Sequence, residues 1–248
     1  MEVAKKVAIV TGAAVRLGRA QALALAGQGA RLVVHYNTSA GPAHDVVSEI
    51  KAMGSDAIAV QADLSQPMRS PAIVEQAIAR FGQVDILVNS ASIFHPGHWD
   101  DTTEENWDRH FDINLKSPFF LTQAFAKAIG RARRGHIVNM ADWRAVSPGI
   151  GHVAYTLTKA ALVAMTKSLA QALAPQIQVN AIAPGLILPP PGYGPEYLDQ
   201  RAPQIPLQRT GTAAEIAETL VFLLRSDFIT GELLYVTGGE HLLTGRYP

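Results

Sequence analysis

The chain has 248 residues, of which 48% are hydrophobic and 17% are charged, and its formal net charge at pH 7 is zero. This length suffices for one large domain with a substantial buried core. The balanced charge argues against a general binder of nucleic acid or of anionic membranes, which would need a basic excess. The sequence contains no cysteine, and this excludes disulfides, thiolate catalysis and cysteine-based metal sites.

No apolar run in the sequence approaches the roughly 20 residues that a membrane-spanning helix requires. The first residues, MEVAKKVAIVTG, carry too short an apolar run for a signal peptide. We therefore expect a cytoplasmic protein that does not bind membranes.

Short apolar runs alternate with helix-length segments along the chain. In chain order, the predicted strands lie in KVAIVT, ARLVVHY, DAIAVQAD, VDILVNSAS, HIVNMAD, IQVNAIAPG and ELLYVTGG. The predicted helices lie at residues 17–28, 43–53, 71–81, 104–129, 155–173 and 213–224. Strands with continuous rather than alternating apolar residues are typical of strands buried on both faces. The pattern predicts a single α/β domain over residues 1–248, with a Rossmann-type doubly wound parallel sheet of about seven strands and helices on both faces.

The first predicted strand runs into the glycine-containing turn TGAAVRLG and then into a helix. Gly12 permits a tight turn, and Gly18 lets the helix pack close to the sheet. The helix N-terminus offers free N–H groups and a partial positive charge to a pyrophosphate. The turn therefore predicts a dinucleotide site, and Arg16 within it is a candidate partner for a cofactor phosphate.

The second predicted strand ends in HYNTS, which contains no acidic residue. A site for NAD usually places Asp or Glu about 20 residues beyond the turn, where it accepts from the ribose 2′-hydroxyl. A carboxylate there would repel a 2′-phosphate, so its absence favours NADPH over NAD. The alternative interpretation is that these are ordinary loop residues. Asp63, in QADL at the third strand, is placed to meet the adenine.

Tyr155 and Lys159 are four residues apart in AYTLTKAAL, and so share one face of a helix. A lysine ammonium one turn away is expected to lower the pKa of the phenol, which is ordinarily about 10. The pair therefore predicts a tyrosine proton donor for a hydride reduction.

A proline-rich segment, APGLILPPPGYGPEYLDQRAPQIP, follows the sixth predicted strand. It is too long for an ordinary connection, and it leaves the carboxyl end of a strand, where ligands bind in such sheets. We expect residues 185–206 to form a loop that covers the substrate; the alternative is a simple surface loop.

Several motifs resemble those of the short-chain dehydrogenase/reductase family. They are TGAAVRLG, ADL, NSAS, DINLKSPF with Asn114, the pair Tyr155 and Lys159, NAIAPG and ITGELLYVTGG, and together they extend over essentially the whole chain. The resemblance implies a nicotinamide cofactor and Tyr155 as the proton donor. It also implies that Asn114 holds a water molecule that links Lys159 to solvent.

One position departs from the family pattern. Members carry a serine upstream of the tyrosine that helps to bind a carbonyl oxygen, but this chain has Asp142 there, and Ser147 stands too close to Tyr155 to replace it. An ionised carboxylate is a poor partner for a ketone oxygen that becomes anionic, whereas it suits a heterocycle with N–H donors. In this respect the chain resembles the pteridine reductases, in which an aspartate replaces the serine.

The pteridine reductases share further features with this chain. They carry an arginine in the glycine turn, an HY pair and then a serine after the second strand, and a phenylalanine after the fourth strand; the matching residues are Arg16, His35, Tyr36, Ser39 and Phe94. The C-terminal half also resembles bacterial dihydromonapterin reductases, in HVAYTLTKAAL and GGEHL. The resemblance implies that Phe94 stacks a pterin against the nicotinamide and that Arg16 reaches the polar edge of the pterin.

The implied site comprises three groups of residues. The expected catalytic residues are Asp142, Tyr155, Lys159 and Asn114. The expected contacts to NADPH are Gly12, Arg16, Leu17, Gly18, His35, Tyr36, Asn37, Ser39, Asp63, Leu64, Asn89, Ser90, Ala91, Met140, Tyr155, Lys159, Pro184 and Gly185. The expected contacts to substrate are Arg16, Ser92, Phe94, Asp142, Tyr155, Gly185 and Leu186. We expect no metal, because His95 and His98 lie in a loop broken by glycine and proline, without rigid ligand geometry.

The sequence thus predicts an NADPH-dependent reductase of pterins, such as biopterin, a dihydropterin or a folate-like substrate. One alternative is a carbonyl or 3-oxoacyl reductase on the same scaffold, and another is a redox-sensing protein that binds the dinucleotide without catalysis. By the same resemblance we expect a homotetramer, in which Arg246, next to Tyr247 in the tail, closes the pocket of a neighbouring subunit.

Overall fold

The computed structural model describes residues 1–190 and 192–243. Seven strands in these ranges form one parallel sheet in the order β3-β2-β1-β4-β5-β6-β7. The strands are β1 (Val7–Val10), β2 (Arg31–Tyr36), β3 (Ala57–Gln61), β4 (Ile86–Asn89), β5 (Gly135–Met140), β6 (Ile177–Pro184) and β7 (Leu233–Val236). The strand order reverses between β1 and β4, the kind of switch point at which open parallel sheets bind their ligands. The predicted doubly wound parallel sheet is confirmed.

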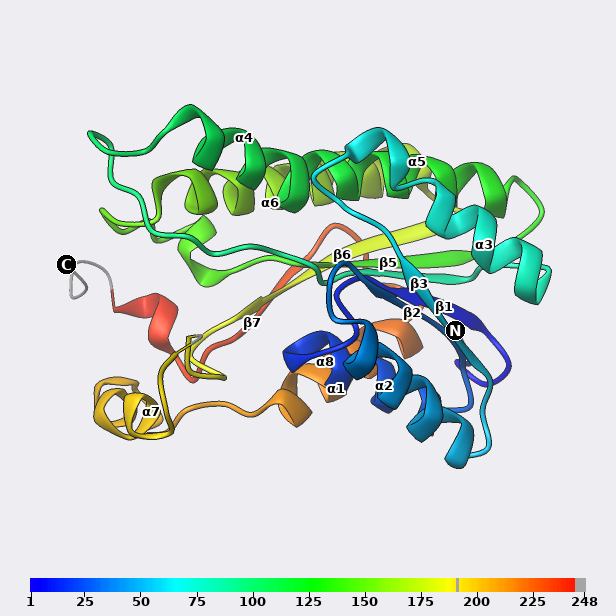
Figure 1. Ribbon diagram of the computed structural model, residues 1–248, viewed down its shortest axis with the longest axis horizontal. Helices are drawn as coiled ribbons and strands as arrows, with labels where there is room; N and C mark the ends of the chain where they lie inside the picture. The colour runs from blue at the N-terminus through cyan, green and yellow to red at the C-terminus, as the bar shows by residue number, and fades with distance from the viewer. Residues whose placement is uncertain (191, 244–248) are drawn as a thin grey trace.

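Helices cover both faces of the sheet (Figure 1). On one face lie α1 (Arg16–Gly27), α2 (Ala40–Ala52) and α8 (Ala213–Arg225), and on the other lie α3 (Ala72–Phe81), α4 (Glu104–Phe111), α5 (Ser117–Ile129) and α6 (Val153–Leu173). The short helix α7 (Glu196–Arg201) lies apart from both groups, near one end of the molecule. Within the described ranges, no helix is both long and apolar enough to cross a membrane.

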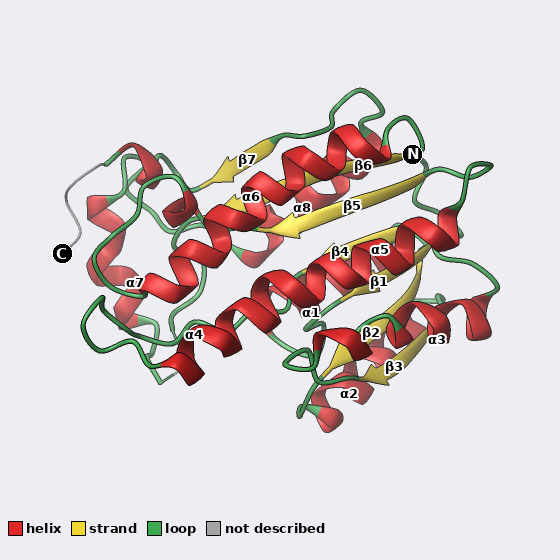
Figure 2. Cartoon of the chain, turned by 90° about the horizontal axis from the view of Figure 1, so that it is seen from above, coloured by secondary structure: helices red, strands yellow, loops and turns green. Residues whose placement is uncertain are grey.

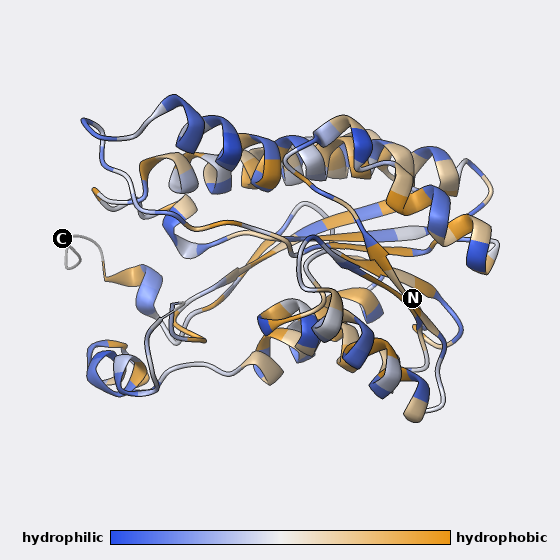
Figure 3. Cartoon of the chain, in the orientation of Figure 1, coloured by the Kyte–Doolittle hydropathy of each residue, from blue (hydrophilic) through white to orange (hydrophobic). Residues whose placement is uncertain are grey.

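The continuous apolar strands are explained by a core on each side of the sheet. In β1, Ala8 and Val10 belong to one buried cluster, whereas Val7 and Ile9 belong to the other. Successive side chains of a strand point to opposite faces, so a strand covered on both sides carries apolar residues on both of its faces. Figure 3 shows this contrast, because the strands are largely hydrophobic and the outer helix α4 is hydrophilic.

The predicted helix over 104–129 forms as α4 and α5, joined by one π-helical turn at Asp112–Lys116. Pro118 stands at the start of α5 and has no N–H, so the regular bond from residue 118 to the carbonyl of Asn114 cannot form. Single π-helical turns of this kind are frequent at functional sites. This turn carries the buried side chain of Asn114.

Because all the strands are parallel, their carboxyl ends meet at one edge of the sheet. In Figure 2 the arrows of β5 and β7 point toward the side of the molecule where α7 lies. The segments that leave β1, β4, β5 and β6 therefore converge there, and they carry most of the predicted site residues.

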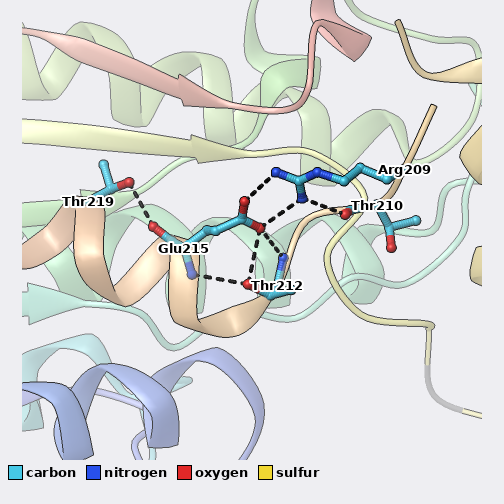
Figure 4. A network of polar contacts seen from close by, with 5 residues as sticks. All are labelled: Arg209, Thr210, Thr212, Glu215 and Thr219. Atoms are coloured by element: carbon cyan, nitrogen blue, oxygen red, sulfur yellow. Dashed lines mark hydrogen bonds and ion pairs between the residues drawn. The ribbon is translucent and has the colours of Figure 1, made fainter. Parts of the chain in front are cut away.

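Helix α8 begins with a reciprocal cap (Figure 4). The backbone N–H of Glu215 donates to Thr212 Oγ1 at 3.2 Å, and the backbone N–H of Thr212 donates to Glu215 Oε2 at 2.8 Å. Arg209 Nη2 also pairs with Glu215 Oε1 at 2.6 Å. The Arg209 guanidinium, followed by the Thr212 N–H, lowers the pKa of Glu215 to about 2. The cap fixes where α8 starts, and α8 packs against α1 behind the glycine turn.

We expect Thr212→Ala to lower the free energy of unfolding by about 1 kcal/mol, because it removes the cap oxygen. This corresponds to a fall in Tm of about 2–4 °C, measurable by thermal and urea denaturation. Thr210→Ala is the matched control, since only the backbone carbonyl of Thr210 accepts a bond from Arg209. Equal effects of the two substitutions would contradict the role of the cap.

Candidate active site

The turn after β1 leaves no room for a side chain at either of its positions Gly12 and Gly18. Gly12 has a φ of 65°, and a Cβ there would lie 3.0 Å from the Cα of Ala91. A Cβ on Gly18 would collide with the backbone carbonyl of Gly12. Val15, the N-cap residue of α1, makes no capping side-chain bond, and the first turn of α1 holds no acidic residue. The turn and the helix start are therefore shaped to receive an anionic group against main-chain N–H groups.

His35, in β2, forms a hydrogen bond with this turn. Its side chain is 2% exposed, its Nδ1 accepts from the Gly12 N–H at 3.1 Å, and its Nε2 lies 3.1 Å from the carbonyl of Ala62. A carbonyl only accepts, so the proton of the neutral ring is on Nε2. Burial lowers the pKa of His35 to about 4. We predicted His35 as a cofactor contact; its two ring nitrogens bond to the main chain of the turn and of Ala62, the residue after β3.

Arg16 is exposed and adopts a left-handed backbone conformation, with φ of 53°. Its Nη2 donates to the carbonyl of Pro189 at 2.9 Å. The guanidinium thus spans from the glycine turn to the segment that follows β6, the segment predicted to cover the substrate. Leu17, beside it, packs against the buried cluster beneath α1.

The ends of β2 and β3 hold the predicted adenosine contacts. The carbonyl of Asn37 accepts from Gln61 Nε2 at 3.2 Å, and Tyr36 and Ser39 lie at the end of β2 and the start of α2. Asp63 accepts from the Ser65 N–H at 2.9 Å, and this bond lowers the pKa of its carboxyl group. The carbonyl of Leu64 accepts from Ser117 Oγ at 2.7 Å, which ties this edge to α5.

The segment after β4 lies against the glycine turn. The N–H groups of Ser90 and Ala91 donate to Thr11 Oγ1 at 2.9 and 3.0 Å. Asn89 is buried, and its Nδ2 donates to Asn139 Oδ1 at 2.8 Å. The exposed Ser92 donates only to the carbonyl of its neighbour Ile93, at 3.3 Å. Hydrogen bonds therefore tie Ser90 and Ala91 to the glycine turn and Asn89 to β5.

Tyr155 and Asp142 face each other across the site. Tyr155 lies on the first turn of α6, Asp142 follows β5, and Tyr155 Oη donates to Asp142 Oδ2 at 2.8 Å. The other carboxylate oxygen accepts from the Arg144 N–H at 2.8 Å and lies 3.5 Å from the guanidinium of Arg144. The carboxylate that replaces the serine of the family pattern is therefore aimed at the predicted proton donor.

The pKa of Tyr155 is raised well above 10, and this corrects the expectation that Lys159 lowers it. Burial of the phenol is the largest cause, and the charge and hydrogen bond of Asp142 follow. Lys159 is also buried, and its Nζ donates to the carbonyl of Met140 at 2.6 Å. Burial lowers the pKa of Lys159 to about 8. The four-residue spacing of Tyr155 and Lys159 does not reveal this sign, because the carboxylate of Asp142 reaches the phenol from the segment after β5.

Asn114 holds the segment after β4. Its Oδ1 accepts from the Ile93 N–H at 2.9 Å, and its Nδ2 donates to the Ile93 carbonyl at 3.1 Å and to Thr158 Oγ1 at 3.3 Å. The side chain thereby joins the π-helical turn to α6 and to the residue that precedes Phe94. The predicted water between Asn114 and Lys159 stays a prediction.

The ring of Phe94 lies next to Tyr155, the predicted proton donor. It meets Tyr155 edge-on, with ring centroids 4.6 Å apart and an interplanar angle of 78°. The residue is 37% exposed, so part of the ring is free to contact a ligand. A flat, partly exposed ring beside a proton donor is suited to stacking a planar substrate.

Glu240 fixes the main chain at the start of the predicted substrate segment. The N–H of Leu186 donates to Glu240 Oε2 at 2.9 Å, and a Cβ on Gly185 would lie 2.6 Å from that oxygen. Pro184 is the last residue of β6. Farther along, the predicted loop contains the short helix α7 and one 3-10 turn, so it is not entirely irregular. Arg246 and Tyr247, predicted to act on a neighbouring subunit, lie outside the described residues.

The sequence was compared with known families and proteins. A family model described as enoyl-(acyl carrier protein) reductase matches residues 12–241. The chain is 37% identical over 242 residues to the 3-oxoacyl-[acyl-carrier-protein] reductase FabG of Staphylococcus aureus strain Mu50, and the match covers 96% of this chain and 98% of FabG. The chain belongs to the short-chain dehydrogenase/reductase family. It is therefore an oxidoreductase.

Solved structures of this family agree closely with the fold. FolM alternative dihydrofolate reductase 1 from Brucella canis, complexed with NADP, superposes with a TM-score of 0.93 at 37% identity, covering 97% of this chain and 96% of FolM. A blue fluorescent protein from a metagenomic library, in complex with NADPH, gives a TM-score of 0.88 at 33% identity, covering 96% and 99% of the two chains. These likenesses confirm the Rossmann-type fold.

Three residues near the site of this oxidoreductase were not predicted as site residues. His110 is fully buried, and its ring lies 6.4 Å from that of Tyr155. His152 is one turn before Tyr155 and stacks on Phe94, and Glu240 holds Leu186. The spacing of His152 from Tyr155, three residues along a predicted helix, could have placed His152 near the site. Nothing in the sequence alone places His110 or Glu240. Among residues 1–190 and 192–243, no group of three or more His, Asp or Glu side chains is arranged to hold a metal ion.

The lowered pKa of His35 predicts a dependence of stability on pH. Between pH 6.5 and about 4 the unfolded chain binds a proton at His35 that the folded chain excludes, so stability falls as pH falls. The loss is at most about 3 kcal/mol. His136, whose pKa burial also lowers to about 4, acts in the same direction.

We expect urea titrations at pH 7 and pH 4.5 to show this loss, and His35→Asn to show a smaller difference between the two pH values. His136 is unchanged in that variant and provides the internal control. Parallel pH dependence in the wild type and His35→Asn would contradict the assignment.

Proposed function

We propose that this chain is an NADPH-dependent reductase of pterins. The observation that carries the proposal is the Asp142 carboxylate, which lies 2.8 Å from the Tyr155 hydroxyl where family members carry a serine hydroxyl. A fixed negative charge disfavours the oxyanion that forms when a ketone is reduced. The same charge favours a substrate that presents N–H groups, because hydrogen bonds to an ionised acceptor are stronger than neutral ones.

The residues present fit NADPH. The glycine turn has no space for a Cβ at Gly18, α1 begins without a side-chain cap, and Arg16 stands beside it with no acidic residue in the stretch that ends β2. These features suit a pyrophosphate and a 2′-phosphate. The FolM and metagenomic structures similar to this chain contain NADP and NADPH, in agreement with this cofactor. NADPH, when bound, supplies the hydride.

In the proposed reaction a ring C=N bond accepts hydride at carbon and a proton at nitrogen. Tyr155 holds that proton, since burial and Asp142 keep its pKa high until the substrate binds. When substrate N–H groups bind Asp142, they offset its charge, and the phenol becomes a better acid. Lys159, fixed by the Met140 carbonyl, places positive charge 5.5 Å from the centre of the Tyr155 ring and stabilises the phenolate that forms.

The exposed part of Phe94 provides the stacking surface, and Arg16 and the residue 185–206 segment lie on the same edge of the sheet. Holding a flat ring in position between reacting groups contributes more to the rate than any one contact, because it converts an encounter into an oriented complex. The similarity to FolM supports a substrate of the pterin class. The homotetramer and the cytoplasmic location stay predictions.

We expect Tyr155→Phe to reduce kcat about 10²- to 10⁴-fold, the usual contribution of a positioned general acid. Binding of NADPH, measured by fluorescence titration, should change by less than about twofold, because the ring remains in place. Tyr235→Phe in β7 is the matched control, since it removes a phenol hydroxyl from a residue whose ring stacks on His241 and not on Phe94 or Tyr155. Turnover by Tyr155→Phe at the wild-type rate would refute the acid assignment.

The substrate class is tested by following NADPH oxidation with biopterin, 7,8-dihydrobiopterin and an acetoacetyl thioester. We expect turnover of at least one pterin and little turnover of the thioester. Asp142→Asn, which keeps the shape and removes the charge, and Asp142→Ser, which restores the family hydroxyl, should each lower kcat/KM for the pterin about 10- to 100-fold.

The two substitutions separate charge from shape. Asp142→Ser should gain activity toward the thioester, whereas Asp142→Asn should not. Reduction of the thioester alone by the wild type would favour the 3-oxoacyl reductase, an activity named for the 37% identical FabG. Binding of NADPH without any turnover would favour a redox-sensing protein.

A further inference from the structure

The ring of Phe94 lies parallel to that of His152, which stands one turn before Tyr155 at the start of α6. The two ring centroids are 3.8 Å apart and the interplanar angle is 11°. Arg144 lies on the same ring, with its Cζ 5.6 Å from the centroid. Together with the edge of Tyr155, these contacts leave Phe94 little freedom to change its plane.

His152 is held in an unusual backbone conformation. Its φ is 56° and its ψ is 44°, a left-handed region that few non-glycine residues occupy. Although it is the N-cap residue of α6, its side chain makes no capping bond to that helix. Its hydrogen bond goes instead to the segment after β4, where Nδ1 lies 2.9 Å from the carbonyl of His95. The conformation therefore aims the ring at Phe94 and at the segment that carries it.

That segment is fixed from two sides. From α6, the Val153 N–H donates to the Gly97 carbonyl at 2.9 Å. From α4, Asn106 Nδ2 donates to the Pro96 carbonyl at 2.9 Å, and His110 Nε2 accepts from the His95 N–H at 3.2 Å. The backbone around Phe94 is thus set by hydrogen bonds. The orientation of its ring is set by its ring contacts, of which the His152 stack has the shortest centroid distance.

We propose that His152 is a positioning residue that sets the plane of Phe94 and thereby the plane in which a flat heteroaromatic substrate lies beside Tyr155 and Asp142. One face of Phe94 is covered by His152, so the substrate stacks on the remaining exposed surface. The statement about substrate rests on the proposed function, whereas the statement about the plane of Phe94 rests on the geometry alone.

Two variants separate the ring of His152 from its hydrogen bond. His152→Asn tolerates the left-handed backbone and keeps an N–H donor for the His95 carbonyl, but it removes the ring. His152→Phe keeps a ring for stacking and removes the donor. Melting temperature and NADPH binding serve as checks that each variant is folded.

We expect His152→Asn to raise KM for 7,8-dihydrobiopterin about three- to tenfold, with kcat and KM for NADPH changed less than about twofold. His152→Phe should keep KM for the pterin within about twofold of the wild type. A purely structural role, through the His95 bond and the start of α6, would give the reverse order. An unchanged KM in His152→Asn, or equal damage in both variants, would overturn the proposal.

A second measurement keeps this proposal distinct from the proposed function. In protein labelled at histidine, the ring protons of His152 should resonate upfield because of the stacked Phe94, and Phe94→Leu should move them downfield. If the wild type reduces no pterin but this shift occurs, the proposed function is wrong and the positioning of Phe94 stands. If the shift does not occur, the stack itself is refuted, whatever the substrate.

Discussion

The hydrogen bond from Tyr155 to Asp142 is the contact on which the rest of the site depends. It joins the first turn of α6 to the segment after β5, the strand that precedes α6 in the chain. Buried beside a carboxylate, the phenol keeps its proton, and its acidity depends on what else engages that carboxylate. In the proposed reaction, substrate recognition by Asp142 and proton donation by Tyr155 are therefore coupled. On that proposal, a substrate that does not bind Asp142 leaves Tyr155 a poor acid, and this disfavours the wrong substrates.

The loops around this pair are held by buried polar side chains rather than by regular secondary structure. His35 joins the glycine turn to Ala62, the residue after β3, and Asn114 joins the π-helical turn to the main chain of Ile93. Each side chain bonds to main-chain groups of an irregular segment, and leaving those groups buried without a partner would cost a few kcal/mol. This edge of the sheet is therefore preformed, and a ligand that binds there has to order few groups.

The fold could be predicted because its signal is local and repeated. Strands covered on both faces are mainly apolar on both sides, as in β1, where all four residues are apolar and buried, and in β4, where three apolar residues precede the buried Asn89. The π-helical turn could also be predicted, since Pro118 lacks the N–H that a regular helix would use. The sign of the Tyr155 pKa shift could not be predicted, because it depends on a carboxylate 13 residues earlier in the chain. Only the folded structure determines where that carboxylate points. The support given by His35 was missed for a similar reason, as an HY pair after a strand does not reveal which ring is buried.

Two features of the site impose separate demands on a substrate. In the proposed function, Asp142 on the segment after β5 selects for N–H donors, whereas Phe94 on the segment after β4 selects for a flat ring. Because the two residues belong to different loops on one rigid sheet, either can change without moving Tyr155 and Lys159, which α6 holds in place. One scaffold can therefore keep its proton donor and its dinucleotide turn while its substrates differ. A 3-oxoacyl-[acyl-carrier-protein] reductase and an alternative dihydrofolate reductase are each 37% identical to this chain. Overall identity thus does not decide the substrate, and the few side chains that face it do.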